Sequence, residues 1–436
     1  MDGAQRQAAL AVRRVLDGGT LGAALTHEAA AAGEDPAGGR RHALVQELAY
    51  GTLRHWGTLD ALTRRLASKP LSDPLLPCLV AVALYQLQHT RAPSFAIVNH
   101  AVDNAATMVR PAAKALVNAL LRRYLRERAA LDESVLADPV ARWSYPGWWI
   151  DRLRTDYPDD WQGILEAGNE RPPLALRVNV RITSRDALLA RFADAGIPGA
   201  PVGAAGVIVA PPRPIAELPG FAEGAFSVQD AGAQLAAPLL RPERGMRVLD
   251  SCAAPGGKTT HLAELADVDI VALDSDLERL SRVRENVARL PHGGARIVVA
   301  EGDAGLPSTW WDGRPFDLIL ADVPCTASGV VRRHPDAKWL RRESDIAGFA
   351  RQQARLLAAM WPCLARGGRM LYATCSVFRD ENEAQVDAFL AKHPDALREI
   401  LTFAPDVAAR GGQLLPSLPG ASHNQDGFFY ALLGKG

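Results

Sequence analysis

Apolar residues recur every three or four positions through the first third of the chain. This spacing is typical of helices that bury one face, and it extends through residues 42–66, 74–87 and 112–125. Prolines fall at the expected breaks between these helices, at Pro70, Pro74, Pro93 and Pro111. The alternation typical of strands does not occur in this part of the sequence. We therefore predict an all-helical domain over residues 1–135.

The pattern becomes mixed over residues 136–225. Residues 174–180 (LALRVNV) and 207–210 (VIVA) have the composition of short strands, whereas residues 184–195 have helical spacing. The sequence between these segments is rich in glycine, proline and alanine, which is typical of loops. We predict a small α+β module that connects the helical domain to the rest of the chain.

From residue 226 to residue 436, short apolar runs alternate with helical stretches. The runs are RVLDSC (247–252), DIVALD (269–274), RIVVAE (296–301), FDLILAD (316–322) and RMLYAT (369–374). Two late apolar segments, residues 398–403 and 427–433, are candidates to complete the sheet. This alternation predicts an α/β domain whose open, mostly parallel sheet is covered by helices.

Side chains suited to binding or catalysis follow the predicted strands. They are Cys252, Asp274, Asp303, Asp322, Cys325 and Cys375. The carboxyl ends of parallel strands meet at one edge of a sheet, and ligands of such sheets bind there. We therefore predict that these side chains share one functional edge.

The segment SCAAPGGK (251–258) joins the first of these strands to a helix through a glycine turn. It matches neither the dinucleotide fingerprint GxGxxG nor the phosphate loop GxxxxGK[ST]. Glycines allow a close approach of backbone to a ligand, and Asp274 at the end of the next strand suits the two hydroxyls of a ribose. S-adenosylmethionine has no phosphates to bind, so it fits this pattern better than a nucleotide does. Without the other acidic strand ends, a helix cap is an equally good interpretation of the turn.

Two thiols beside a cofactor indicate covalent chemistry. Carbon 5 of a pyrimidine is a poor nucleophile until a thiolate adds to carbon 6 and pushes electron density onto it. Cys325 and Cys375 are candidates for this chemistry, and nearby cations such as Arg332, Arg333 and Lys338 are candidates to stabilise a thiolate. The zinc signature of cytosine deaminases is absent, as is the Asn/Asp-Pro-Pro-aromatic motif of amino-directed methyltransferases. Cys78, Cys252 and Cys363 are interpreted as packing residues.

Composition narrows the remaining classes. The chain has 436 residues, 48% of them hydrophobic, and a net charge of zero, so bulk charge does not indicate a nucleic-acid partner. We find no apolar run long enough to span a bilayer, no signal peptide and no metal-ligand spacing, and we expect a cytoplasmic protein without disulfides or a bound metal. Basic clusters occur at 119–128 and 330–342; each alone is more often a solvated face than a binding surface.

Three long motifs resemble those of the RNA cytosine-5 methyltransferases. They are SCAAPGGKTTHLAE, ADVPCTASGVVRRHPDAKW and YATCSVFRDENE. The segments GVVRRHPDAKWLRR and DGFFYALL are particularly similar to the bacterial subfamily that modifies small-subunit (16S) rRNA. The first 135 residues resemble the helical RNA-binding domain of the NusB type that this subfamily carries. The resemblance covers nearly the whole chain and implies a Rossmann-like catalytic domain.

The resemblance implies a role for each matching position. Cys375 is implied as the nucleophile, Cys325 as the group that helps to break the adduct, and Asp322 as the residue that hydrogen-bonds the cytosine and supplies its proton. Residues implied to line the S-adenosylmethionine pocket are Cys252, Ala253, Ala254, Pro255, Gly256, Gly257, Lys258, Asp274, Asp303 and Asp322.

We therefore expect a monomeric, S-adenosylmethionine-dependent 16S rRNA cytosine-5 methyltransferase whose partner is RNA. Three arginines of the helical domain are hypothesised to contact RNA phosphates: Arg122, Arg123 and Arg126. Cytosine-5 methylation of tRNA, and a non-catalytic RNA-binding or antitermination role, remain alternatives.

Overall fold

A computed structural model describes the chain except for residues 1, 34–38, 405–406, 408, 419 and 422. The chain divides into two compact units. The first contains residues 1–169 and 331–343, and the second contains residues 170–330 and 344–436. Within the described residues, no helix is long and apolar enough to cross a membrane.

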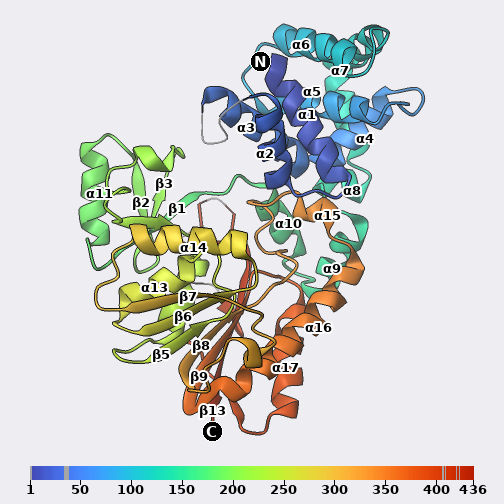
Figure 1. The fold of residues 1–436 in the computed structure, drawn as a ribbon. Coiled ribbons are helices and arrows are strands. Elements are labelled where there is room, and N and C mark those ends of the chain that lie inside the picture. The colour runs from blue at the N-terminus through green and yellow to red at the C-terminus, as the bar shows by residue number, and fades with distance from the viewer. Residues whose placement is uncertain (1, 34–38, 405–406, 408, 419, 422) are drawn as a thin grey trace. The chain divides into compact units, whose positions relative to one another are not determined.

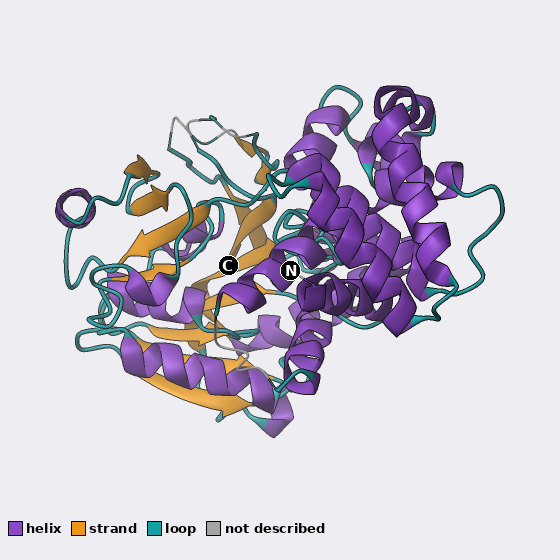
Figure 2. Ribbon diagram, turned by 90° about the horizontal axis from the view of Figure 1, so that it is seen from above, coloured by secondary structure: helices purple, strands orange, loops and turns teal. Residues whose placement is uncertain are grey.

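The first unit is built from helices, drawn in purple in Figure 2. Their bounds are α1 Asp2–Leu16, α2 Leu21–Ala31, α3 Arg40–Arg54, α4 Trp56–Leu66, α5 Leu75–His89, α6 Ser94–Met108, α7 Ala113–Val135, α8 Pro139–Trp143, α9 Gly147–Asp156, α10 Trp161–Asn169 and α15 Ala337–Leu340. Helix α5 is apolar on all sides, and every side chain from Leu79 to Leu84 is fully buried. It packs against α1, α3, α4 and α6. A helix of this composition forms the centre of a bundle, so the all-helical prediction is confirmed.

Residues 139–169, which we assigned to the mixed module, are helical and belong to the first unit. The start of α8 shows why a helix forms here. Asp138 caps it by accepting a hydrogen bond from the backbone N of Val140 (2.9 Å), and Pro139 occupies the first helical position, where no backbone N–H is needed.

The segment Val331–Glu343, which follows Cys325 in the sequence, also belongs to the first unit. Lys338 is fully buried there and donates hydrogen bonds to the backbone O of Arg54 and to Asn169 Oδ1, both at 2.7 Å. Its ammonium lies 4.3 Å from the centre of the Tyr145 ring. Burial lowers the pKa of Lys338 well below its ordinary value, so this residue is part of the packing of the unit.

Neighbouring residues attach the same segment. Trp339 Nε1 donates to the backbone O of Leu53 (2.8 Å), and Asp336 Oδ2 accepts from the backbone N of Leu21 (2.9 Å). Arg332 is 1% exposed. Arg332 and Lys338, which the sequence suggested as cations that stabilise a thiolate, are both buried, and the hydrogen bonds of Lys338 are made within the helical unit.

The second unit begins with a small antiparallel sheet in the order β2-β3-β1-β4. Its strands are β1 Leu174–Val178, β2 Gly199–Val202, β3 Gly206–Val209 and β4 Phe226–Val228, and α11 Arg185–Asp194 packs on it. Ser184 caps α11 by accepting from the backbone N of Ala187 (3.2 Å). Phe192 of α11 meets Phe226 edge to face in the core, with ring centres 6.0 Å apart. The predicted strands and helix of the α+β module are present.

The larger sheet of the second unit has the strand order β11-β12-β13-β9-β8-β5-β6-β7, with β10 also paired to β13 (Figure 1). The strands are β5 Arg247–Asp250, β6 Asp269–Asp274, β7 Arg296–Glu301, β8 Phe316–Asp322, β9 Leu364–Thr374, β10 Ala396–Glu399, β11 Ala409–Arg410, β12 Gln413–Leu414 and β13 Phe428–Lys435. The accompanying helices are α12 Ala236–Leu240, α13 Gly257–Leu265, α14 Leu277–Arg289, α16 Glu343–Met360 and α17 Glu383–Lys392. Strands β5 to β9 are parallel, and β13 runs antiparallel to β9. The predicted α/β fold is confirmed.

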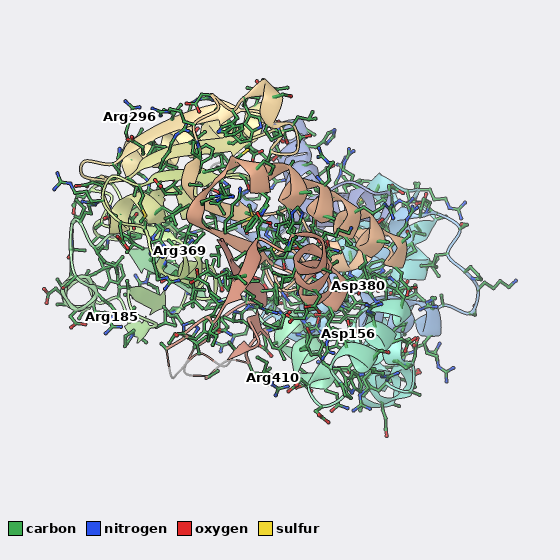
Figure 3. All side chains as sticks on the ribbon, turned by 90° about the horizontal axis from the view of Figure 1, so that it is seen from below. Asp156, Arg185, Arg296, Arg369, Asp380 and Arg410 are labelled. Atoms are coloured by element: carbon green, nitrogen blue, oxygen red, sulfur yellow. The ribbon has the colours of Figure 1, made fainter. Side chains whose placement is uncertain are left out.

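One late strand differs from the prediction. The strand β10 ends at Glu399, so most of the apolar segment 398–403 lies outside it. Ile400 is 94% exposed, because the chain leaves the sheet after its pairing with β13 ends. At the opposite edge, β7 begins with Arg296, whose exposed side chain is labelled in Figure 3. A charged residue on an edge strand disfavours pairing with another chain.

Strand order places a switch point between β5 and β8. From β5 the chain builds outward through β6 and β7, and it then returns to the other side of β5 to build β8 and β9. The loops that follow β5 and β8 therefore diverge at this point. A crevice at the carboxyl ends of these two strands is where an open α/β sheet binds its ligand.

Candidate active site

The turn after β5 requires glycine at position 256. Gly256 has a φ of 96°, in the left-handed region, and is the N-cap residue directly before α13. A Cβ at this position would lie 3.2 Å from the Cα of Val283, a backbone atom that cannot move aside easily. The glycine therefore serves both a backbone conformation and a close contact with α14.

A buried ion pair stabilises the turn between β5 and α13. Arg177 of β1 is fully buried and donates to both carboxylate oxygens of Glu264, at 3.0 and 2.7 Å. It also donates to the backbone O of Gly257 (2.5 Å) and to Thr260 Oγ1 (3.1 Å). The small sheet thus fixes the first turn of α13.

Asp274 at the end of β6 joins the turn directly. Its Oδ2 accepts from the backbone N of Ala254 and its Oδ1 from the backbone N of Asp276, both at 3.1 Å. Arg279 donates to the backbone O of Ala254 (2.9 Å). A carboxylate has about four acceptor positions, so Asp274 retains capacity for ribose hydroxyls.

Asp303 has a different environment from the one that we expected. Its carboxylate accepts two hydrogen bonds from Arg355, at 3.0 and 3.2 Å, and one from the backbone N of Gly305 (2.8 Å). The Arg355 guanidinium lowers the pKa of Asp303. Asp303 follows the strand next to β6, but its side chain is paired with α16 and forms no hydrogen bond with another predicted site residue among those the structure describes.

Lys258 connects the cofactor turn to the end of β8. Its Nζ donates to Asp322 Oδ2 at 2.6 Å, and it lies 5.8 Å from the centre of the Phe428 ring. Burial alone would lower the pKa of Lys258, but the charges of Asp322 and Cys375 and the hydrogen bond to Asp322 raise it. Lys258 is therefore held in its charged form beside Asp322, and its charge interacts with that of Cys375.

The two candidate thiols are in contact. Cys325 Sγ and Cys375 Sγ lie 3.3 Å apart, and the loops that carry them are joined by a hydrogen bond from the backbone N of Gly329 to the backbone O of Cys375 (2.8 Å). Cys325 is buried and Cys375 is partly exposed. The hydrogen bond to Cys375, burial and the charge of Glu381 all raise the pKa of Cys325 well above its ordinary value. Cys325 is therefore a protonated thiol that can donate to Cys375.

Cys78 and Cys363 are packing residues, as predicted, whereas Cys252 in the cofactor turn is partly exposed. Cys78 and Cys363 are each 1% exposed, and burial raises the pKa of Cys78 to about 12 and that of Cys363 to about 11. Burial also raises the pKa of Cys252. Within the described residues, no group of His, Cys, Asp and Glu is arranged to hold a metal ion.

The sequence interpretation missed a buried polar network next to the thiols. Glu381 accepts from Ser376 Oγ at 2.6 Å and from the backbone N of Thr326 at 2.9 Å. Asn382 donates to the backbone O of Ser376 (2.9 Å). The signal was present in the motif YATCSVFRDENE, where acid and amide side chains follow the cysteine at a short interval.

The three arginines proposed to contact RNA lie on α7. Arg122 and Arg126 are exposed, whereas Arg123 is partly buried and pairs with Glu127 (3.0 Å). Arg123 also donates to the backbone O of Leu66 (3.2 Å). Arg122 and Arg126 are thus the better placed of the three to meet a phosphate.

The side chains at this edge fit S-adenosylmethionine. Asp274 and Asp322 each lie beside one cation, Arg279 (3.9 Å) and Lys258 (2.6 Å), and these acidic side chains suit the sulfonium and ammonium groups of that cofactor better than they suit phosphates. The buried Oδ1 of Asp250 has no hydrogen-bond partner among the described residues, although Oδ2 accepts from Thr259 (2.6 Å).

Comparison with known proteins matches three parts of the chain to known families. Residues 237–434 match the family described as 16S rRNA methyltransferase RsmB/F, residues 145–216 match the ferredoxin-like domain of RsmF/B-like methyltransferases, and residues 3–126 match the NusB family. The chain is 46% identical to ribosomal RNA small subunit methyltransferase B of Salmonella arizonae over 90% of each chain.

Solved structures show the same architecture. The structure of PH0851 aligns with a TM-score of 0.78 and 25% identity over 100% of this chain and 99% of that one. A methyltransferase homologue from Pyrococcus horikoshii aligns with a TM-score of 0.58 and 29% identity over 68% of this chain and 97% of that one. The chain therefore belongs to the RsmB/F family of S-adenosylmethionine-dependent methyltransferases.

Proposed function

We propose that the protein methylates carbon 5 of a cytosine in 16S rRNA through a covalent cysteine adduct. The observation that carries the proposal is the pair of thiols 3.3 Å apart at the sheet edge that also carries Lys258 and Asp322. Methylation of oxygen or nitrogen requires positioning and a base, and it has no use for two thiols. The curated relatives named as small-subunit rRNA methyltransferases support 16S rRNA as the substrate.

Cofactor binding is assigned to the turn that contains Gly256 and to Asp274 and Asp322. S-adenosylmethionine, when bound, supplies the electrophilic methyl group that carbon 5 receives. Asp274 retains acceptor capacity for the ribose, and Gly256 keeps the backbone close. Asp303 has the weakest support for a place in the pocket, because Arg355 occupies its carboxylate.

Cys375 is assigned as the nucleophile because it is the more exposed of the two thiols and interacts with the charge of Lys258. Its thiolate adds to carbon 6 of the ring, and the electron pair of the 5,6 double bond moves toward carbon 5 and the ring nitrogen. The Lys258 ammonium, 2.6 Å away, transfers a proton to the Asp322 carboxylate, and Asp322 delivers that proton to the ring nitrogen.

Release requires a second group. After carbon 5 is methylated, its proton leaves to a base, the ring nitrogen returns its proton to Asp322, the double bond re-forms, and the carbon–sulfur bond breaks with its electron pair returning to Cys375. Cys325 is assigned to this step because its thiol hydrogen-bonds the departing sulfur. A donor to that sulfur stabilises the thiolate as it leaves.

Two substitutions test the division of roles. Cys375→Ala should abolish both methylation and the RNA adduct that survives denaturing electrophoresis. Cys325→Ala should accumulate that adduct, because attack continues while release is slowed. Cys363→Ala is the matched control, since Cys363 is a buried cysteine of the same unit. An adduct formed by Cys375→Ala would show that the roles are reversed.

Bisulfite sequencing of RNA identifies the substrate. In cells that lack the protein, one cytosine of 16S rRNA should lose its methyl mark. Loss of a mark in tRNA would favour the tRNA alternative. Failure of the purified protein to bind S-adenosylmethionine would favour a non-catalytic RNA-binding role, which the match of residues 3–126 to the NusB family keeps in consideration.

A further inference from the structure

We infer that Glu381 is a positioning residue: its buried carboxylate joins the two cysteine segments and holds Cys325 and Cys375 at their working separation. The inference rests on the proposed function, because it concerns the geometry that adduct formation and release require. Among the described residues, Glu381 forms no hydrogen bond with either thiol. It acts on the residues that follow each of them.

Glu381 accepts four hydrogen bonds while being fully buried. One oxygen accepts from the backbone N of Thr326 (2.9 Å) and from Gln353 Nε2 (3.1 Å). The other accepts from Thr326 Oγ1 (2.5 Å) and Ser376 Oγ (2.6 Å). Thr326 directly follows Cys325, and Ser376 directly follows Cys375. One carboxylate therefore fixes both loops within a residue of their cysteines.

A group of hydroxyls completes the connection. Ser328 Oγ lies 2.9 Å from Ser376 Oγ and 3.1 Å from Thr326 Oγ1. Ser328 Oγ also accepts from the backbone N of Val377 (2.9 Å). The three hydroxyls all come from the two cysteine loops. Because the Glu381 carboxylate accepts from Thr326 and Ser376, these hydroxyl groups can lie close together with their O–H donors hydrogen-bonded.

Asn382 holds the Cys375 loop from its other side. Its Nδ2 donates to the backbone O of Ser376 (2.9 Å), and its Oδ1 accepts from Thr374 Oγ1 (2.5 Å). Cys375 thus lies between two anchored residues. The Cys325 loop has a matching second anchor, since Gln353 Nε2 donates to the backbone O of Pro324 (2.9 Å) as well as to Glu381.

The charge of Glu381 also favours a hydrogen bond from Cys325 to Cys375. Burial raises the pKa of Glu381, and its four donors oppose that shift. No lysine or arginine in the described part of the chain forms an ion pair with it. Its negative charge contributes to the raised pKa of Cys325, which keeps that thiol protonated and able to donate to Cys375.

The test measures adduct formation on RNA that carries 5-fluorocytidine, because fluorine at carbon 5 prevents the proton loss that leads to release. Glu381→Ala removes every bond to the two loops and should slow adduct formation about a hundredfold, as expected for reacting groups misplaced by about 1 Å. Glu381→Gln retains the size and part of the acceptor capacity and should slow it about tenfold. Affinity for S-adenosylmethionine should stay within about twofold of the wild type, since a positioning residue affects kcat rather than ground-state binding.

Asn179→Ala is the matched control for lost stability. Asn179 is fully buried in the small sheet region and makes three hydrogen bonds, to the backbone O of Gly224 and Pro291 and from the backbone N of Arg181. Its loss should lower the melting temperature and leave the adduct rate of the folded protein unchanged.

Each outcome has a distinct meaning. If Glu381→Gln and Glu381→Ala bind the cofactor and form the adduct at the wild-type rate, the inference is overturned. An equal loss of rate in Asn179→Ala would also overturn it, since general destabilisation would then explain the effect. If Glu381→Ala does not fold, Glu381→Gln decides alone. A wild-type protein that forms no adduct with this RNA would refute the proposed function itself.

Discussion

Asp250 should make the second unit less stable as the pH rises toward neutrality. This carboxyl at the end of β5 is fully buried, and burial raises its pKa from the ordinary value of 3.8 to about 7. The hydrogen bond from Thr259 limits the increase, and the charge of Asp322 adds to it. A folded-state pKa above the unfolded value means that the folded protein holds a proton that the unfolded chain has already lost.

The magnitude follows from the two pKa values. A difference of about three units corresponds to about 4 kcal/mol between the fully protonated and fully ionised states. The contribution is complete below the unfolded pKa and is lost as the pH rises through the folded one. Between pH 5 and pH 7.5 the free energy of unfolding should therefore fall by about 2 to 3 kcal/mol.

Asp250→Asn isolates this effect. The amide resembles the protonated carboxyl in shape, still accepts from Thr259, and does not titrate. The variant should exceed the free energy of unfolding of the wild type by about 2 kcal/mol near pH 5 and by about 4 kcal/mol at pH 7.5, so the gap should widen by about 2 to 3 kcal/mol between the two pH values.

Urea denaturation at the two pH values measures the difference, with the cofactor omitted because its positive charge would favour the ionised carboxylate. Unfolding of the helical unit provides an internal control, since Asp250 lies in the other unit. Parallel pH profiles for the wild type and the variant would refute the reasoning. A variant that is less stable at pH 7.5 would show that the charged form of Asp250 is the stabilising one.

Three further predictions concern other parts of the molecule. Gly256→Ala places a Cβ against Val283 at a positive φ, so it should lower the free energy of unfolding by about 1 to 2 kcal/mol and weaken S-adenosylmethionine binding in a calorimetric titration. Gly313→Ala, at an open turn that also has a positive φ, should leave that binding unchanged. Arg177→Met leaves Glu264 buried without its partner, so it should lower the free energy of unfolding of the second unit by about 3 to 5 kcal/mol, measured by urea denaturation. Arg191→Met removes an exposed ion pair and is the control; a smaller loss for Arg177→Met than for this control would contradict the prediction. Replacing the three arginines of α7 (Arg122, Arg123 and Arg126) should weaken RNA binding. The slope of log binding constant against log salt concentration should become shallower by about 0.7 to 0.9 for each phosphate that is no longer neutralised, and an unchanged slope would exclude these residues as phosphate contacts.

The sequence predicted the sheet well because strand spacing is a local property. The strands that carry the predicted site are five short apolar runs, and all five are strands of the larger sheet. Their order could not be predicted from these runs, yet a shared carboxyl edge was enough to bring Asp274, Asp322 and the two thiols into one region. Position after a strand, however, does not say which partner a side chain takes. Asp303 shows this, because Arg355 of a distant helix occupies its carboxylate.

Charge clusters were harder to interpret from sequence. Lys338 and Arg332 look like surface cations in a basic run, but both are buried, and only the three-dimensional packing of the helical unit reveals that. Glu381 is a second case in which the sequence does not reveal that a charged residue is buried. An acidic residue in a polar motif is usually exposed, and its burial depends on hydroxyl donors from two loops that are 50 residues apart, Thr326 and Ser376.

The location of Val331–Glu343 within the helical unit bears on how the chain folds during its synthesis. Helices α1 to α10 leave the ribosome first, but the backbone oxygens of Leu53 and Arg54 receive their buried donors only from Trp339 and Lys338. At about 5 to 20 residues per second, this segment is made roughly 10 to 30 seconds after Asn169. The amino-terminal unit is therefore first to begin folding but cannot complete its core until strands β5 to β8 of the catalytic sheet have been translated.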